Sequence, residues 1–394
     1  MTRRLNMDLY LKQLKNRYNQ ACRKAKALIL NEFCDTSGYH RKHAIRLLTQ
    51  PEFRRAKPKQ EGRGRKRIYL PAPLLAPLKQ IWLAANQMCG KRLKAAIPIW
   101  LPFYEETYGM LDANVRTQLF TMSEATIDRL LQPERARFPK RMCGTKPGSL
   151  LKKHIPIKTN QWNEQQPGFV EADTVAHCGE SLMGDFAWSI TLTDIYSGWT
   201  ENRAIWGKGA QGVVEQIHDI EHGLPFPILG FDSDNGSEFL NHHLLRYFRE
   251  RSEPVQFTRS RPYHKDDNAH VEQKNWTHVR QLFGYYRIES KALIAKMNDV
   301  YRHECSLLHN YFFPTMKLIE KCRIQSKIIK KHDKPQTPYQ RIMASEYIDS
   351  SQKERLAAIY KTLNPFKLRA SLEVKLKNIF SHVDVNLKGR RTAI

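Results

Sequence analysis

The sequence of 394 residues has no hydrophobic run long enough to cross a membrane. A spanning helix needs about 18 or more consecutive apolar residues, and no stretch approaches that length. The N-terminus carries basic residues but no continuous apolar segment, so a secretory signal is not expected either. These two absences predict a cytoplasmic protein without a membrane partner.

Paired cysteines are also missing. The 7 cysteines are odd in number, scattered along the chain and never spaced as Cys-x-x-Cys. This usage indicates free thiols in a reducing compartment and argues against a disulfide framework. A zinc site built from Cys22, Cys34, His40 and His43 is the alternative, but that spacing matches no common zinc-binding pattern.

Acidic residues are scarce relative to basic ones. The chain has 39 Asp and Glu residues against 65 Lys and Arg residues, which gives a formal net charge of +26. So strong a positive charge predicts a polyanionic partner, and nucleic acid is favoured over a membrane surface. With 41% hydrophobic residues, the chain has enough apolar side chains to form several globular domains.

Residues 1–55 show the pattern of an N-terminal helix-turn-helix domain. A helical segment breaks at Thr36, Ser37 and Gly38, and a short amphipathic segment follows. A helix, a short turn and a basic helix form the plan in which the second helix enters the major groove. A plain helical hairpin with a solvated charged face is the alternative. The apolar side of the second helix holds Ala44, Ile45, Leu47 and Leu48. The side expected to contact DNA holds Arg41, Lys42 and Arg46.

Residues 56–70 form a basic linker rich in Pro, Gly, Lys and Arg. Arg63 and Arg65 are expected to enter the minor groove of DNA, as arginines on flexible arms commonly do. Nonspecific contacts to phosphates are the alternative.

Residues 71–150 are expected to form a second helical domain of the helix-turn-helix type. Ser123 is a suitable cap for a helix that directs Ile127, Leu130 and Leu131 inward. Arg129 lies on that helix and is expected to contact DNA. Two such domains in tandem would recognise a longer DNA site than either alone.

From residue 165 to residue 310 the pattern changes to strands that alternate with helices. Three strand patterns come first, the third richer in polar residues and expected at a sheet edge. A helix, a strand, a second helix and a last strand follow. This order predicts an α/β core, a mixed five-stranded sheet with flanking helices, between all-α N-terminal domains and a helical tail. The tail, residues 311–394, is basic.

Three separated segments of this core carry acidic residues. Glu171 and Asp173 share one face of the first strand, because strand side chains alternate. Asp232 and Asp234 end the strand that precedes the second helix of the core. Glu272 falls inside the apolar stripe of a long amphipathic helix, where a carboxylate is costly unless a partner offsets its charge.

Each acidic segment has an ordinary structural alternative. Asp-Asn-Gly sequences favour turns for backbone reasons alone, and Glu272 could pair with Arg280 or Lys274 at the edge of the stripe. Carboxylate oxygens are nevertheless the ligands that hard divalent cations prefer. Three carboxylates from separate segments suit phosphoryl transfer with two Mg²⁺ or Mn²⁺ ions, which activate the attacking oxygen and stabilise the leaving one.

Residues from about 168 to 285 resemble the catalytic core of retroviral integrases and the related bacterial insertion-sequence transposases, which have a ribonuclease H-like fold. The resemblance lies in Asp173, in the Asp-Asn-Gly-Ser-Glu-Phe run that begins at Asp234, and in Glu272 after Asn-Ala-His-Val. It implies that these three acids are the catalytic, metal-binding triad, in preference to Glu171 and Asp232. The spacing between the last two acids is slightly longer than in the family.

The resemblance also implies a function. A DNA transposase of this type would bind the terminal inverted repeats of its element and carry out strand cleavage and strand transfer. It would work in the bacterial nucleoid as a homodimer or larger assembly on double-stranded DNA. A metal-dependent nuclease without joining activity and an inactive DNA-binding regulator are the alternatives. By the same resemblance, the residues expected to flank the DNA end are Tyr263, His264, Asn268, Lys274 and Asn275.

Overall fold

The structure is a computed structural model that describes residues 2–49, 69–137, 164–207, 209–233, 239, 242–259, 271, 274–324 and 327–383. Only the backbone is described for residues 2–9, 12, 210, 242, 245, 259, 321–324 and 327–330. The chain divides into two compact units, Met1–Ile68 and Tyr69–Ile394. No helix among the described residues combines the length and the apolar character needed to cross a bilayer.

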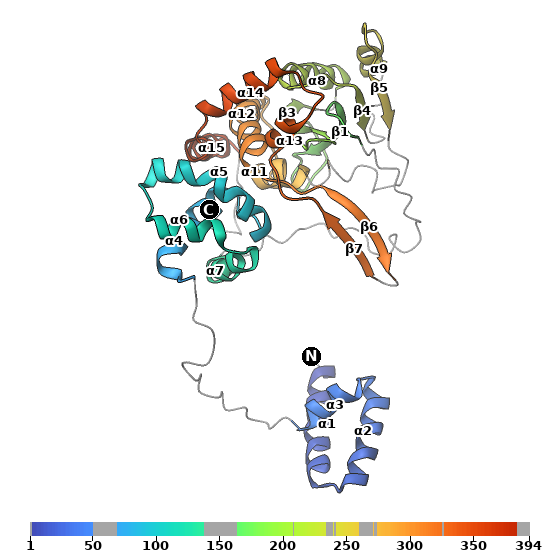
Figure 1. Cartoon of the computed structure of the whole chain (residues 1–394). Helices are drawn as coiled ribbons and strands as arrows, with labels where there is room; N and C mark the ends of the chain where they lie inside the picture. Colours follow the sequence, from blue (N-terminus) through green and yellow to red (C-terminus); the bar gives the residue numbers. More distant parts are fainter. Residues whose placement is uncertain are drawn as a thin grey trace. The chain divides into compact units, whose positions relative to one another are not determined.

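The first unit consists of three helices: α1 (Thr2–Gln20), α2 (Arg23–Ser37) and α3 (Arg41–Thr49) (Figure 1). Their shared core includes Leu14, Phe33 and Leu48, which are almost completely buried. Gly38 ends α2 with φ +71°, a left-handed conformation that glycine adopts without strain, and the chain turns there into α3. The predicted helix, glycine turn and second helix are present. Of the residues on the apolar side of the second helix, Ala44 and Leu48 are fully buried, whereas Ile45 is 37% exposed.

The second unit contains a five-stranded sheet with the strand order β3-β2-β1-β4-β5. Strands β1 and β2 are antiparallel, as are β2 and β3, whereas β4 runs parallel to both β1 and β5. This mixed arrangement with flanking helices is ribonuclease H-like, and it confirms the predicted fold class. The strands are β1 (Phe169–Ala176), β2 (Ala187–Asp194), β3 (Thr200–Trp206), β4 (Gly230–Ser233) and β5 (Gln256–Arg259).

Several helices cover this sheet. The helix α8 (Ala210–Gly223) packs on β3 and buries Val213, Ile217 and Ile220, spaced at one helical face. The π-helical turn η2 packs on β1, and α12 and η3 pack on β3. The remaining bounds are α9 (His242–Arg249), η2 (Asn275–Arg280), α11 (Gln281–Phe283), α12 (Leu293–Val300), η3 (Tyr301–Cys305) and η4 (Leu308–Phe312).

The edge strand β3 has its outer backbone groups covered by two asparagines. Asn298 on α12 accepts the N–H of Ala204 at 2.6 Å and donates to the carbonyl of the same residue at 3.0 Å. Asn310 on η4 makes the same pair of bonds with Thr200, at 2.9 and 3.1 Å. The predicted edge position of the third strand is therefore confirmed. Its polar residues are buried because α8, α12 and η3 pack on this strand.

The helices before the sheet belong to the same compact unit as the sheet itself. Trp100 on α5 donates its indole N–H to the carbonyl of Phe312 at 3.0 Å and packs edge-on against Phe366 of α15. One continuous hydrophobic core runs from Leu74 to Val383. The segments 71–150, 165–310 and 311–394, anticipated as successive domains, thus share a core. These helices are α4 (Pro71–Ala84), α5 (Gly90–Tyr108), α6 (Ala113–Thr121) and α7 (Glu124–Arg137).

The C-terminal region is helical in α13 (Pro338–Ala344), α14 (Ser350–Thr362) and α15 (Pro365–Phe380), as predicted. Between η4 and α13, however, the chain forms a separate two-stranded antiparallel ribbon of β6 (Leu318–Ile324) and β7 (Lys327–His332). A wholly helical tail was therefore a wrong prediction. The isoleucines that recur in this segment are β-branched residues, which favour strands over helices.

Candidate metal and DNA site

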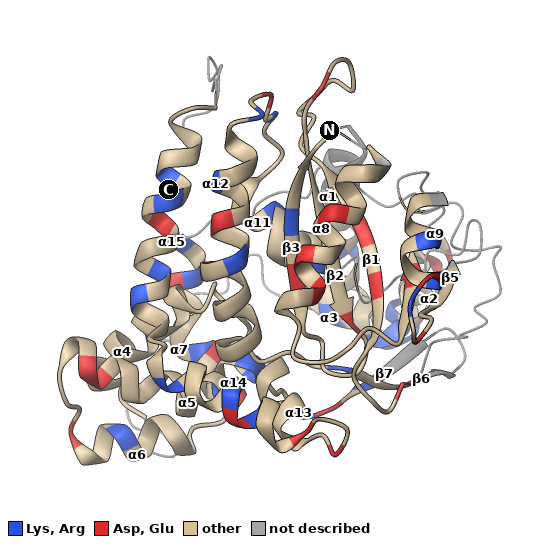
Figure 2. Ribbon diagram, turned by 90° about the horizontal axis from the view of Figure 1, so that it is seen from above, with Lys and Arg blue, Asp and Glu red and all other residues tan. Residues whose placement is uncertain are grey.

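The central strand β1 carries two acidic residues, Glu171 and Asp173, and its ribbon has red bands in Figure 2. The two residues share one face of the strand because strand side chains alternate. Glu171 is 4% exposed and accepts the backbone N–H of Val271 at 3.1 Å. Asp173 is half-buried and accepts the side-chain amide of Asn275 at 2.5 Å and the N–H of Thr174 at 2.7 Å. Both carboxylates thus contact the helical region that follows β5 by way of residues about a hundred positions away in the sequence.

The two β1 acids have different surroundings, and the difference separates their possible roles. Glu171 is buried and bonded to a backbone donor, which makes it a fixed anchor for the helical segment at Val271. Asp173 lies two residues further along, closer to solvent, and its partners include the side chain of Asn275 and the backbone N–H of Thr174. A carboxylate that must bind a hydrated metal ion needs such access, so the geometry favours Asp173.

Asp232, the described acid of β4, is 7% exposed and accepts the hydroxyl of Thr258 on β5 at 2.7 Å. It lies directly across from Glu171 in the parallel register between β1 and β4. The register continues with Ala172 opposite Ser233, the last residue of β4. Asp232 is therefore a buried group that ties β4 to β5.

The helical turn η2 carries the residues nearest to Asp173. The side-chain oxygen of Asn275 is buried and has no hydrogen-bond partner among the described residues, while its amide holds Asp173. Lys274, which was expected to flank DNA, is half-buried and donates to the carbonyl of Gly198 at 3.1 Å. Burial, with the charges of Arg92 and Arg341, lowers the pKa of Lys274 to about 7.

Several predicted site residues lie outside the residues that the structure describes. These are Asp234, Glu272, Arg63, Arg65, Tyr263, His264 and Asn268. On the described helices, the basic residues expected to contact DNA are at the surface: Arg41, Lys42 and Arg46 on α3, and Arg129 on α7. Arg129 bonds within its own helix to the carbonyl of Ala125 and the hydroxyl of Thr126, each at 3.2 Å.

The described residues supply some of the donor atoms that a divalent cation needs. No group of three or more His, Cys, Asp or Glu side chains able to hold a metal occurs in the described part of the chain. The available donors are nevertheless of the right kind. Asp173 offers carboxylate oxygen, and Asn275 offers a buried amide oxygen that no other described group satisfies. Oxygen donors of this type suit Mg²⁺ or Mn²⁺ and suit soft metals poorly.

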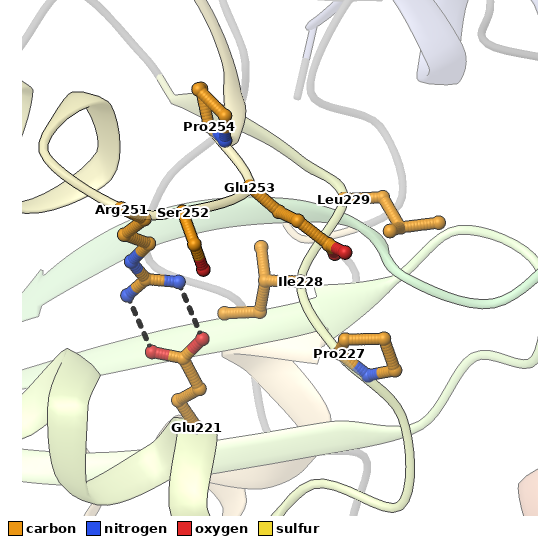
Figure 3. A pocket seen from close by; sticks show the side chains of 8 residues that line it. All are labelled: Glu221, Pro227, Ile228, Leu229, Arg251, Ser252, Glu253 and Pro254. Atoms are coloured by element: carbon orange, nitrogen blue, oxygen red, sulfur yellow. Dashed lines mark hydrogen bonds and ion pairs between the residues drawn. The ribbon is translucent and has the colours of Figure 1, made fainter.

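A cavity of about 390 Å³ lies away from these residues (Figure 3). It sits at the amino-terminal ends of β4 and β5, lined by Leu229 and Pro254 among others. The guanidinium of Arg251 is paired there with both carboxylate oxygens of Glu221, each at 2.6 Å, as Figure 3 shows. The positive charge of Arg251 is neutralised by Glu221, and neither Glu171 nor Asp173 lines this cavity. The cavity is therefore not part of the candidate site.

Sequence reasoning missed the basic residues that bond to the turn between β2 and β3. Arg341 on α13 donates to the carbonyl of Ser197 at 3.2 Å, and Lys317 donates to the carbonyl of Tyr196 at 2.7 Å. Together with Lys274 on Gly198, three cations from distant segments hold this turn. The only local signal was Gly198 itself, whose φ of +74° marks a tight turn.

No protein-family model matches the chain. A search of curated proteins finds the "Uncharacterized protein y4rM" of Sinorhizobium fredii, 38% identical over 353 residues that cover 86% of this chain and 97% of the relative. The chain belongs to the y4rM family. The match thus spans nearly the whole of the relative and most of this y4rM-family chain.

Solved structures similar to the y4rM-family chain include the catalytic core domain of HTLV-2 integrase in complex with magnesium, with 14% identity and a TM-score of 0.28. That match covers 38% of this chain and 92% of the other. The catalytic core domain of BIV integrase has 16% identity and a TM-score of 0.28, covering 46% and 96%. A simian T-cell lymphotropic virus intasome has 13% identity and a TM-score of 0.31, covering 56% and 71%. The fold assignment itself rests on the sheet order and strand directions.

Proposed function

We propose that the chain is a DNA transposase of the integrase type, which cleaves and joins DNA strands with two divalent metal ions. The observation that carries this proposal is the bond between Asp173 of β1 and Asn275 of η2. It joins the acid in the middle of β1 to a residue that follows Glu272 by three positions in the sequence. The resemblance to integrase and transposase cores implies that Asp173 and Glu272 are metal ligands.

Covalent connectivity supports the same triad. Glu272 follows Val271, whose N–H is bonded to Glu171. Asp234 follows Ser233, whose neighbour across the sheet is Ala172. Val271 and Ser233, the described residues that precede these two acids in the sequence, are both joined to β1. We therefore propose Asp173, Asp234 and Glu272 as the metal ligands.

The remaining residues have supporting roles in this proposal. Bound metal ions would supply the Lewis acidity that activates water and then the DNA 3′ hydroxyl. Asn275 positions Asp173 through its amide, and its buried oxygen has no hydrogen-bond partner among the described residues. Glu171 fixes the start of the helical segment, and Lys274 braces the turn at Gly198. The proposed contacts to the DNA end are Tyr263, His264, Asn268 and Asn275.

DNA recognition is proposed for the helical parts that precede the sheet. Arg41, Lys42 and Arg46 are exposed on α3, which follows a glycine turn as a recognition helix would. Arg129 is exposed on α7. These helices, with the linker arginines Arg63 and Arg65, would bind the terminal inverted repeats of the element. Because two element ends must be joined, we propose a dimer or larger assembly on DNA in the bacterial nucleoid.

The test compares substitutions of the two β1 acids. We expect Asp173→Asn to lower Mg²⁺-dependent cleavage and joining of an oligonucleotide end by about 1,000-fold or more, on the scale of removing one member of a catalytic set. We expect Glu171→Gln to lower the rate by less than about tenfold, because an amide oxygen still accepts the N–H of Val271. Asp185→Asn, an exposed acid of the same unit, is the matched control.

The outcomes separate the candidate functions. Equal activity of the Asp173→Asn variant and the native chain would contradict the triad, as would undiminished joining by Asp234→Asn or Glu272→Gln. Cleavage without joined products would indicate a nuclease, and absence of any Mg²⁺-dependent cleavage would indicate a DNA-binding regulator.

A further inference from the structure

The ribbon of β6 and β7 stands apart from the five-stranded sheet as a sheet of its own. Figure 1 shows it running out from the body of the second unit. A two-stranded ribbon without a further layer is only marginally stable in water. A segment of this kind needs a second source of stabilisation, either at its base or from a partner.

The strand register concentrates positive charge on the ribbon. Lys321 lies directly opposite Lys330, and residues opposite one another in an antiparallel pair share a face. Arg323 is two residues from Lys321 and so falls on that face as well. A face with this charge favours a polyanionic partner. The basic residues from 317 to 331 are Lys317, Lys321, Arg323, Lys327, Lys330 and Lys331, against the single acid Glu320.

The base of the ribbon is rigidly bonded to the core. Two hydrogen bonds join Lys317 and Asp333: the N–H of Lys317 donates to the side-chain carboxylate of Asp333 at 2.6 Å, and the N–H of Asp333 donates to the carbonyl of Lys317 at 3.0 Å. Arg341, 6% exposed, donates to Asp333 at 2.9 Å and to the carbonyl of Thr315 at 2.8 Å. The ribbon is therefore an arm with a fixed root.

That root is linked to the start of the helical turn η2. Arg341 and Lys317 both donate to the turn between β2 and β3, to which Lys274 also donates at Gly198. Lys274 immediately precedes Asn275, the residue bonded to Asp173. A molecule held along the ribbon would thus be held at a fixed position relative to the acids of β1.

We propose that the ribbon of β6 and β7 is an arm that binds double-stranded DNA through its phosphates and holds the duplex beside the candidate metal site. The major groove of B-DNA admits a two-stranded β-ribbon, and the excess of Lys and Arg complements the phosphate charge. The DNA contact stands on the ribbon's own charge and register, and its role in catalysis rests on the proposed function. A second copy of this chain, paired along an open strand edge, is the competing occupant.

The test measures how DNA affinity depends on salt in the full chain, without divalent metal so that no cleavage intervenes. The variant is Arg323→Glu with Lys330→Glu, which removes two cations and leaves Lys321 opposite an acid, an arrangement favourable to the ribbon. We expect the slope of log affinity against log salt to become shallower by about 2, since each phosphate contact contributes about 0.9. The matched control is Lys361→Glu with Lys377→Glu, exposed positions on α14 and α15.

A slope equal to that of the control overturns the proposal. If hydrogen exchange shows the ribbon unfolded in the Glu variant, the neutral Arg323→Gln with Lys330→Gln variant is judged by the same criterion. A change in sedimentation mass with an unchanged salt slope also overturns it and indicates a self-association surface. Absence of Mg²⁺-dependent cleavage by the native chain would contradict the proposed function but would not affect the salt-slope result. Failure of the proposed function and failure of the ribbon proposal can therefore be distinguished.

Discussion

Asn275 is the residue whose role is hardest to infer from the sequence and clearest in the structure. Its amide donates to Asp173 at 2.5 Å, while its oxygen is buried without a partner among the described residues. A π-helical turn such as η2 often marks a functional position. The same residue thus orients Asp173, the proposed metal ligand, and has a second polar atom beside it.

We predict that Asn275→Ala raises the Mg²⁺ concentration for half-maximal DNA cleavage by about 10- to 100-fold, the usual effect of losing a partner that orients a metal ligand. Metal titration of the cleavage rate is the measurement. Gln281→Ala is the control, because Gln281 lies on the same helical segment and bonds to Asn86 at 2.8 Å, away from the acids. An unchanged metal requirement would show that Asn275 does not position Asp173.

At the scale of elements, the edge of the sheet is covered by side chains in place of another strand. Asn298 and Asn310 are 6% and 0% exposed, and each satisfies both backbone groups of one residue in β3. An open edge pairs readily with other chains, so this covering also protects the protein from self-association.

We predict that Asn298→Leu and Asn310→Leu each lower the free energy of unfolding by about 2–5 kcal/mol. Either change leaves one N–H and one carbonyl of β3 buried and unpaired, at about 1–3 kcal/mol per group. Urea unfolding measures the loss. Asn378→Leu on α15 is the control, because Asn378 is exposed and bonds to Lys296. Losses equal to that of the control would mean that water or another group satisfies the edge.

At the scale of the whole molecule, the second unit holds three neutral histidines in its interior. Burial, together with Arg280, lowers the pKa of His177 to about 3. Burial and nearby Lys274 lower the pKa of His309 to about 3, and burial lowers that of His278, which stacks on His309, well below its usual value. Asp194 has the opposite shift, because burial outweighs its hydrogen bonds and raises its pKa to about 6.

These shifts predict acid sensitivity. Below about pH 6.5 the unfolded chain protonates each histidine and the folded chain does not, so the free energy of unfolding falls by about 1.4 kcal/mol per pH unit for each. Asp194 opposes this trend below about pH 6, because the folded state then binds the extra proton. Urea unfolding of the second unit from pH 7 to pH 5 is the measurement. His309→Gln should make the decline shallower, and an unchanged slope would contradict a neutral His309.

The sequence by itself determined the order and type of the core elements. Alternating apolar residues specify the strands and amphipathic stripes specify the helices, since both are local periodicities. The mixed five-stranded sheet follows from that order. Spacing also made Asp173 and Glu171 candidates, but it left them equivalent, because both face the same side of one strand. The assignment of Asp173, Asp234 and Glu272 as metal ligands stays a prediction.

Only the tertiary structure decided which distant groups meet. Glu171 binds the backbone N–H of Val271, and Asp173 binds the side chain of Asn275. These partners are about a hundred residues away in the sequence, so no local pattern predicts them. The helices α4 to α7 share one core with the sheet. The sequence shows that the helix of Trp100 has an apolar face but not which distant segment, here the one containing Phe312, packs against that face. The ribbon root likewise depends on Arg341, one basic residue among many in the sequence. Long-range packing and burial of charge, not periodicity, fix these positions.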